Sequence, residues 1–237
     1  MALNIVDRPS PNHDARDAAI DMLVLHYTGM KTADEALARL CDPAAKVSAH
    51  YTIDRDGCVY VHVPEERRAW HAGASVWKGK SGVNACSIGV ELVNPGHEFG
   101  YIPFADDQIA SLTELAQGIL ARHAIPARRV LAHSDVAPGR KTDPGELLPW
   151  KRLAENGIGL WPGISPHLSG EVDPRNADRV GGDFTGNLAR FGYGVPPAAD
   201  IPLETVVAAF QRHFRPSRID GVADAECGAI LADLLAG

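Results

Sequence analysis

The chain has 237 residues, of which 45% are hydrophobic and 22% charged, and its formal net charge at pH 7 is -7. This length and apolar content suit one large globular domain, or a medium domain followed by a small one. The acidic balance argues against nucleic acid as a partner, and no apolar run approaches the roughly 18 residues of a transmembrane segment.

The first residues of the chain bear on its compartment. The N-terminus, MALNIVDRPSPNHDARD, lacks the basic start and the apolar core of a secretory signal. As written, the chain is therefore expected in the cytoplasm. A processed or trimmed N-terminus would leave the periplasm or the cell envelope as the alternative.

The first part of the chain alternates strands and helices. Met22 to Leu25 form a short apolar strand, and a capping box at Thr32 and Glu35 predicts that a helix follows. The segment HYTIDRDGCVYVHV, residues 50–63, contains two alternating strands on either side of the turn Arg55-Asp56-Gly57. These features predict a β-hairpin after the first strand and helix.

A further strand is expected at residues 87–93, and it carries a carboxylate. Ile88, Val90 and Leu92 share one face of this strand because side chains alternate along it. Glu91 therefore projects from the opposite face, away from the apolar row.

A helix and a last strand complete this part of the chain. Residues 106–123 have the apolar spacing of an amphipathic helix. Val130 to Ala132 form a strand that leads into His133. We therefore expect an α/β domain over residues 1–160, with a central mixed β-sheet flanked by helices.

The composition changes after this domain. Gly, Pro, Asn and Asp dominate between about Leu153 and Asp183, which predicts a linker at 161–182. The remaining residues, 183–237, are expected to form a small three-helix domain. Its apolar stripes have helical spacing and comprise Leu203, Val206, Val207, Phe210 and Phe214, then Cys227, Ile230, Leu231 and Leu234, after a shorter helix near Phe184 to Phe191.

Three residues of the first domain have the chemistry of metal ligands. His26 and His133 each follow a short strand, and Asp143 lies in a loop rich in Pro and Gly. Two neutral imidazoles and one carboxylate suit Zn²⁺ and leave a fourth coordination position for water. The set predicts a catalytic site with Zn²⁺ as cofactor. Each histidine taken alone is better explained as a polar residue at a strand end, and only the pattern of all three favours a metal site.

Five segments connect these residues to a known family. They are LHYTG, SAHYTIDRDGCVY, AWHAG, NACSIGVELVN and AHSDVAPGRKTDPG, within residues 21–161. In this order they resemble bacterial zinc N-acetylmuramoyl-L-alanine amidases, whose relatives include phage lysozyme-type amidases and animal peptidoglycan recognition proteins. The resemblance implies hydrolysis of the amide bond between N-acetylmuramic acid and L-alanine, in peptidoglycan or in muropeptides.

The resemblance also implies roles for individual residues. The family's zinc ligands fall on His26, His133 and Asp143 of this sequence. Its glutamate, which accepts a proton from the zinc-bound water, falls on Glu91. Its lysine falls on Lys141, which can stabilise a developing oxyanion.

Further positions match residues that line the cleft of relatives. These expected substrate contacts are His50, Trp70 and His71. Phage-type members carry a catalytic tyrosine immediately before the histidine that matches His50, and that position is Ala49 here. The chain therefore resembles the members that use a glutamate.

The C-terminal residues resemble the three-helix peptidoglycan-binding domains that are attached to cell-wall hydrolases. VVAAFQRHF and DGVADAECGAIL carry this looser resemblance. It implies that this domain binds the wall and takes no part in the chemistry. A chain ending near Gly163 is then expected to hydrolyse small soluble muropeptides.

Two alternatives to the amidase remain at this point. A non-catalytic peptidoglycan-binding protein would lose ligands, whereas Asp143 and Glu91 are both present here. A zinc endopeptidase of the stem peptide could use the same metal chemistry, although the sequence has no HExxH segment of the common metalloproteases. The sequence leaves open whether the substrate is intact wall or soluble anhydro-muropeptides.

Overall fold

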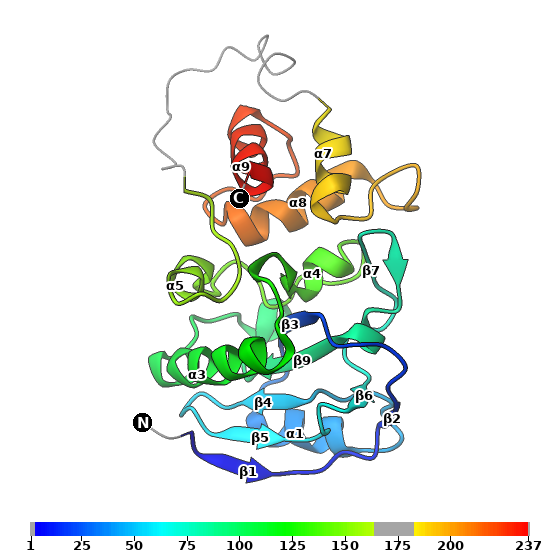
Figure 1. Ribbon diagram of the computed structural model, residues 1–237. Helices are drawn as coiled ribbons and strands as arrows, with labels where there is room; N and C mark the ends of the chain where they lie inside the picture. The colour runs from blue at the N-terminus through cyan, green and yellow to red at the C-terminus, as the bar shows by residue number, and fades with distance from the viewer. Residues whose placement is uncertain (1–2, 164–182, 237) are drawn as a thin grey trace.

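The structure is a computed structural model that describes residues 3–163 and 183–236 (Figure 1). The predicted linker at 161–182 falls outside the described residues, except for its first three positions. Within the described ranges, no helix has both the length and the apolar character needed to cross a membrane.

A six-stranded mixed sheet forms the centre of the first domain, in the order β1-β5-β4-β9-β3-β10. Its strands are β1 (Ile5–Asp7), β3 (Met22–Tyr27), β4 (Tyr51–Ile53), β5 (Val59–Val61), β9 (Ser87–Leu92) and β10 (Val130–Ala132). The hairpin partners β4 and β5 run antiparallel, and the other neighbouring strands run parallel. The mixed sheet and the hairpin predicted from the sequence are therefore confirmed.

Two small sheets were not predicted. They pair β2 (His13–Ala15) with β6 (Arg67–Ala69) and β7 (Val76–Trp77) with β8 (Lys80–Ser81). The helices of this part are α1 (Ala33–Cys41), α2 (Gly96–Phe99), α3 (Asp106–His123), α4 (His133–Val136) and α5 (Trp150–Glu155), with 3-10 turns at Val83–Cys86 and Ala127–Arg129.

Two local predictions can be compared with the structure in detail. The hydroxyl of Thr32 accepts a hydrogen bond from the backbone N–H of Glu35 at 3.2 Å, so the predicted helix start is confirmed. The first strand, however, continues beyond Leu25, because β3 pairs with β9 as far as Tyr27. His26 therefore lies within a strand, and the expectation that it follows one was wrong.

The side chains of the sheet alternate between two hydrophobic clusters. Leu23 and Leu25 of β3 pack in a cluster that includes residues of α3 and α5. Met22 and Val24, on the other face of the same strand, pack in a cluster that includes residues of the C-terminal helices. The alternation of a single strand thus joins both cores.

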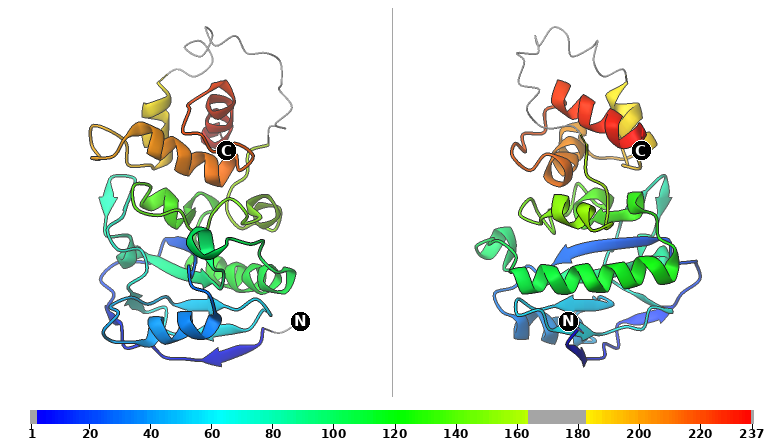
Figure 2. Two further views of the ribbon diagram at one scale, coloured as in Figure 1. Left: turned by 180° about the vertical axis from the view of Figure 1, so that it is seen from behind. Right: turned by 60° about the vertical axis from the view of Figure 1, so that its left-hand side comes forward.

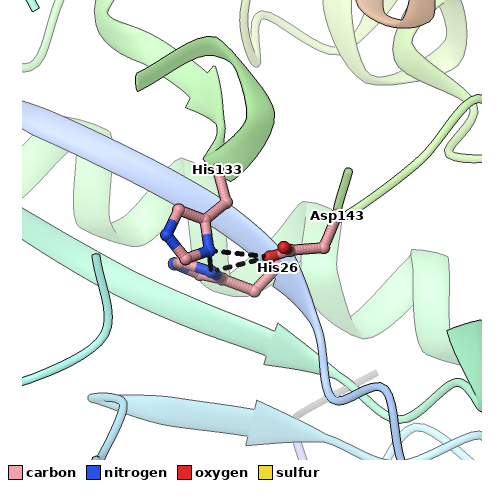
Figure 3. A group of neighbouring side chains, drawn as sticks. All are labelled: His26, His133 and Asp143. Carbon is pink, nitrogen blue, oxygen red and sulfur yellow. Dashed lines mark hydrogen bonds and ion pairs between the residues drawn. The ribbon is translucent and has the colours of Figure 1, made fainter. Parts of the chain in front are cut away.

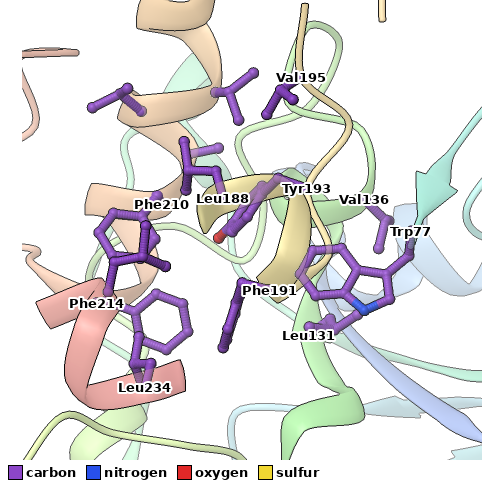
Figure 4. Packing of buried hydrophobic residues seen from close by; sticks show 14 of the residues in the cluster. Trp77, Leu131, Val136, Leu188, Phe191, Tyr193, Val195, Phe210, Phe214 and Leu234 are labelled. Carbon is purple, nitrogen blue, oxygen red and sulfur yellow. The ribbon is translucent and has the colours of Figure 1, made fainter. Parts of the chain in front are cut away.

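The C-terminal part contains the three predicted helices, α7 (Phe184–Phe191), α8 (Leu203–Phe214) and α9 (Ala225–Ala236). They lie at one end of the molecule, beside α4 and β7, and two further views give the same arrangement (Figures 1 and 2). Trp77, Leu131 and Val136 of the first part share one buried cluster with them (Figure 4). The two parts of the chain are therefore joined by a common core.

Candidate metal site and active-site cleft

The three ligand-type residues meet near the ends of two neighbouring strands. His26 lies in β3, His133 begins α4 directly after β10, and these strands run parallel, so their carboxyl ends share one edge of the sheet. The Nδ1 atoms of the two histidines are 2.9 Å apart, and Oδ2 of Asp143 lies 3.0 Å from each (Figure 3). All three side chains are buried. The structure thus brings the predicted ligands together.

A backbone carbonyl fixes the orientation of His133. Nε2 of His133 lies 3.1 Å from the carbonyl oxygen of Ala72, and a carbonyl oxygen can only accept. Nε2 therefore carries the proton, and Nδ1 presents a lone pair. The guanidinium of Arg140 donates to the same oxygen at 2.6 Å, which holds the carbonyl in place.

A chain of hydrogen bonds fixes the orientation of His26. The hydroxyl of Ser87 donates to the carbonyl of Val83 at 2.7 Å, so its oxygen accepts from Nε2 of His71 at 3.1 Å. Nδ1 of His71 is then an acceptor, and Nε2 of His26 donates to it at 3.0 Å. The Nδ1 atom of His26 is therefore left with its lone pair.

Three acceptor atoms consequently face one another without a proton between them. Burial, with a further effect from the neighbouring His133, lowers the pKa of His26 to about 4, so its ring is neutral at pH 7. Such acceptors repel one another unless a cation lies between them. Ligands of a tetrahedral ion with bonds of about 2.0 Å are spaced by about 3.3 Å, close to the distances here. The group can hold a metal ion.

Glu91 lies beside this group. It pairs in register with His26 across β3 and β9, on the strand face opposite to Ile88, Val90 and Leu92, as predicted. Among the described residues, its Oε2 atom is buried without a hydrogen-bond partner. Burial, together with the charge of Asp143, raises the pKa of Glu91 well above its usual range.

The face that carries Glu91 is shaped to admit His71. A Cβ atom added at Gly89 would lie 2.3 Å from Cγ of the His71 ring. A glycine is required there because any side chain would displace the ring that holds His26.

A cleft of about 570 Å³ lies over these groups. Lys141 lines it, and the positive charge of Lys141 acts on the pKa of Glu91 in the direction opposite to burial. The other lining residues are Tyr27, Thr28, Gly29, Met30, Ala36, Arg39, Leu40, Val47, Ser48, Trp70, His71, Glu91, Glu98, His133, Arg140, Thr142 and Asp143. The site therefore opens to a space large enough for a substrate.

The expected substrate contacts divide into two groups. Trp70 and His71 line the cleft, but His50 does not and has 0% of its surface exposed. Nδ1 of His50 accepts from the backbone N–H of Gly89 at 2.9 Å, so the ring is used inside the fold. The expectation that His50 contacts substrate is corrected accordingly. Ala49 is also fully buried.

Several residues of the cleft were not singled out in the sequence. Tyr27 and Arg140 adjoin the matched residues His26 and Lys141, so their place in the motifs was a usable signal. Arg39 and Glu98 reach the cleft from α1 and α2. Arg39 and Glu98 reach the cleft only because these two helices pack beside the site, and no local sequence pattern predicts that packing.

A buried group of two histidines and one aspartate at the floor of an open cleft, on a mixed α/β sheet, is the arrangement of a metal-dependent hydrolase. A sequence model described as N-acetylmuramoyl-L-alanine amidase matches residues 16–146. The chain belongs to this family.

Individual relatives agree with the family assignment. N-acetylmuramoyl-L-alanine amidase AmiD of Escherichia coli (strain K12) is 41% identical over 233 residues, which cover 91% of this chain and 82% of that protein. The 1,6-anhydro-N-acetylmuramyl-L-alanine amidase AmpD of Enterobacter cloacae is 35% identical over 164 residues, covering 61% of this chain and 86% of that protein. The second match is confined to a shorter part of this chain.

Two solved structures extend the similarity to the fold. The complex of AmiD from E. coli with anhydro-N-acetylmuramic acid-L-Ala-D-gamma-Glu-L-Lys has a TM-score of 0.76 at 39% identity, covering 94% of this chain and 92% of that one. AmpDh3 of Pseudomonas aeruginosa in complex with anhydromuramic pentapeptide has a TM-score of 0.75 at 34% identity, covering 90% of each chain.

The activity follows from these matches. The chain is an N-acetylmuramoyl-L-alanine amidase, which hydrolyses the amide bond between N-acetylmuramic acid and L-alanine. The amidase activity predicted from the five motifs is confirmed, in preference to the binding protein and the endopeptidase.

Proposed function

We propose that this amidase uses Zn²⁺, held by His26, His133 and Asp143, to hydrolyse soluble anhydro-muramyl peptides. The observation that carries the proposal is the convergence of three atoms of ligand type, each within 3.0 Å of the other two, beneath an open cleft. Two imidazole nitrogens and one carboxylate oxygen form a donor set that suits Zn²⁺.

The substrate class rests on the cleft and on the relatives. The solved complexes of AmiD and AmpDh3 contain anhydro-muramyl peptides. A cleft of about 570 Å³ falls within the range of about 300–1,000 Å³ that is usual for small-molecule sites. The volume of the cleft therefore supports a single small muramyl peptide as the substrate.

The residues around the ligands supply the proton chemistry. Zn²⁺, when bound, lowers the pKa of a water molecule and polarises a carbonyl group. Glu91 takes a proton from the attacking water and delivers it to the nitrogen of the leaving L-alanine. Its unpartnered Oε2 atom leaves it free to do so. Lys141 stabilises the negative charge that develops on the carbonyl oxygen.

The cleft histidine and tryptophan have different tasks in this proposal. His71 is a positioning residue, because its Nδ1 accepts from Nε2 of His26 and so keeps the other nitrogen of His26 available. Trp70, which lines the cleft, contacts the substrate. His50 positions the backbone at Gly89, beneath the ring of His71.

Product analysis tests the proposed substrate. The full chain is incubated with anhydro-N-acetylmuramyl-L-Ala-γ-D-Glu-L-Lys and, separately, with intact sacculi, and the products are identified by mass spectrometry. We expect the anhydro-sugar and the free tripeptide, formed faster than any peptide from sacculi. Cleavage within the peptide, or faster release from sacculi, would contradict the proposed specificity.

A further inference from the structure

A second buried carboxylate lies next to the metal ligands. Asp135 belongs to α4, two residues after His133, and has 0% of its surface exposed. Its Oδ2 atom accepts from the backbone N–H of Ala132 at 2.8 Å and from Nδ1 of His213 at 2.7 Å. Its Oδ1 atom accepts from the hydroxyl of Tyr193 at 2.6 Å. The two oxygens thus have three donors.

Two of these donors come from the C-terminal part of the chain. Tyr193 follows α7, and His213 lies in α8, 58 and 78 residues after Asp135. The ring of His213 is stacked on Trp150 of α5, with centroids 3.7 Å apart, and on Phe214, at 3.8 Å. Packing on both faces holds the donor nitrogen in one direction.

The remaining donor connects Asp135 to the metal ligands. The bond to Ala132 fixes the turn at which β10 ends and α4 begins, and His133 is the first residue of that helix. The next residue, Ser134, donates its backbone N–H to the carbonyl of Asp143 at 2.9 Å. The same turn therefore sets the positions of two of the three ligands.

We propose that Tyr193 and His213 are positioning residues of the metal site and that they act through Asp135 on His133 and Asp143. A buried carboxylate is stable only while its donors are in place. Without the C-terminal donors, Asp135 would turn toward water and release the α4 turn. The helical part is then a component of the catalytic scaffold, whether or not it also binds the wall. The inference rests on the metal site proposed above.

The packing around α7 supports a fixed attachment. The backbone N–H of Lys78 donates to the carbonyl of Gly192 at 2.8 Å. A Cβ atom at Gly192 would lie 2.3 Å from the indole of Trp77. A chain ending near Gly163 would expose this indole and the rest of the shared core, so the test uses the full chain with single substitutions.

The variants separate positioning from general stability. His213→Leu removes the donor to Asp135, whereas His213→Asn returns an amide N–H at the place of Nδ1. Tyr193→Phe removes the second donor and keeps the ring in the core. Leu231→Ala is the matched control, because Leu231 lies in α9, is 1% exposed and packs in the same cluster.

The measurements are the dissociation constant for Zn²⁺, obtained by competition with a chromophoric chelator, and the absorption spectrum of the Co²⁺-loaded protein. Removing a direct hydrogen-bond partner of a metal ligand weakens binding by about 10- to 100-fold. Because Asp135 acts one step further out, we expect about 3- to 10-fold for His213→Leu and Tyr193→Phe, with an altered Co²⁺ spectrum. His213→Asn should restore both values. Leu231→Ala should lower Tm and leave both unchanged.

Three results would overturn the inference. Unchanged Zn²⁺ affinity in both His213→Leu and Tyr193→Phe would leave these residues with a structural role only. If Leu231→Ala weakened Zn²⁺ binding by the same factor, the effect would be due to lost stability and not to positioning. A wild-type protein that binds neither Zn²⁺ nor Co²⁺ would refute the metal site itself, and the coupling with it.

Discussion

Two buried clusters of histidine and aspartate meet at α4, and they differ in the balance of donors and acceptors. Around Asp143, three atoms lie within 3.0 Å of one another, and the hydrogen bonds that His26 and His133 make through Nε2 leave all three as acceptors. Around Asp135, each carboxylate oxygen accepts from an O–H or N–H group. The same residue types can thus form a metal site or a hydrogen-bonded structural cluster. The number of N–H and O–H donors around the carboxylate decides which of the two forms.

The difference has consequences for stability. An unmatched group of acceptors costs free energy in the metal-free protein and is retained for binding and chemistry. A carboxylate whose oxygens all accept hydrogen bonds, here called a matched group, stabilises the fold and has few lone pairs free to bind a ligand. The two clusters are therefore expected to respond in opposite ways when one acceptor is replaced.

The largest expected effect concerns Glu91, the carboxyl group whose Oε2 atom also lacks a donor. Glu91→Gln keeps the shape of the side chain and removes its ability to take a proton. We expect kcat to fall by about 10² or more, the usual contribution of a general acid or base. Zinc content should stay near the wild-type value, as measured by metal analysis of the same preparation.

Glu98→Gln is the control for this experiment, because Glu98 also lines the cleft but is exposed. Because substitutions at exposed positions usually have small energetic effects, this variant should change kcat by less than about 3-fold. Wild-type turnover by zinc-loaded Glu91→Gln would remove Glu91 from the mechanism.

An intermediate effect is expected when each cluster loses one carboxylate oxygen. In the presence of a chelator, Asp143→Asn introduces N–H groups among the unpaired acceptors and should raise the free energy of unfolding by about 1 kcal/mol. Asp135→Asn places an amide N–H against a donor and should lower it by about 1–3 kcal/mol. Denaturant unfolding measures both. A loss of similar size in the two variants would show that the clusters do not differ as described.

The smallest effect is expected at a third carboxylate, Glu65, which is matched like Asp135. It accepts from Tyr51 at 2.7 Å, and from Arg122 and His123 at 2.6 Å. Burial acts to raise the pKa of Glu65, but these hydrogen bonds outweigh it and lower the pKa to about 2. The ionised form therefore stabilises the fold above the unfolded pKa of about 4.3, and this contribution is lost as the pH falls toward 2.

The comparison uses the variant Glu65→Gln, whose side chain cannot titrate. Between pH 5 and pH 3, the wild type should lose about 1–2 kcal/mol more stability than this variant. Chemical unfolding at each pH measures the stability of the two proteins. An equal loss of stability in both would contradict the assignment of Glu65 as a carboxylate whose oxygens all have donors.

Much of the fold was predictable from local patterns. The helical spacing of 106–123 and the apolar strand at 130–132 gave the observed bounds of α3 and β10. The grouping of His26, His133 and Asp143 was predictable because ordered motifs carry these residues and because His–His–Asp is a recognisable donor set for a metal ion. The position of Glu91 followed from strand alternation, and the structure bears this out.

The remaining features depend on contacts between distant residues. Asp135 finds its donors 58 and 78 positions away, and no local pattern indicates such a pairing. His50 resembled a cleft residue because it sits in a motif, whereas folding buries it under Gly89. Strands of two or three residues, such as β7, are too short for periodicity to be detected.

The most direct test of the central claim is a zinc titration of the metal-free protein. Hydrolysis of the anhydro-muramyl tripeptide is followed as Zn²⁺ is added in steps. Activity should rise in proportion to the metal and level off at about one equivalent per chain, the stoichiometry of a single three-ligand site. His26→Ala should bind no zinc tightly and should remain inactive throughout. Full activity after exhaustive chelation, before any Zn²⁺ is added, would contradict the account.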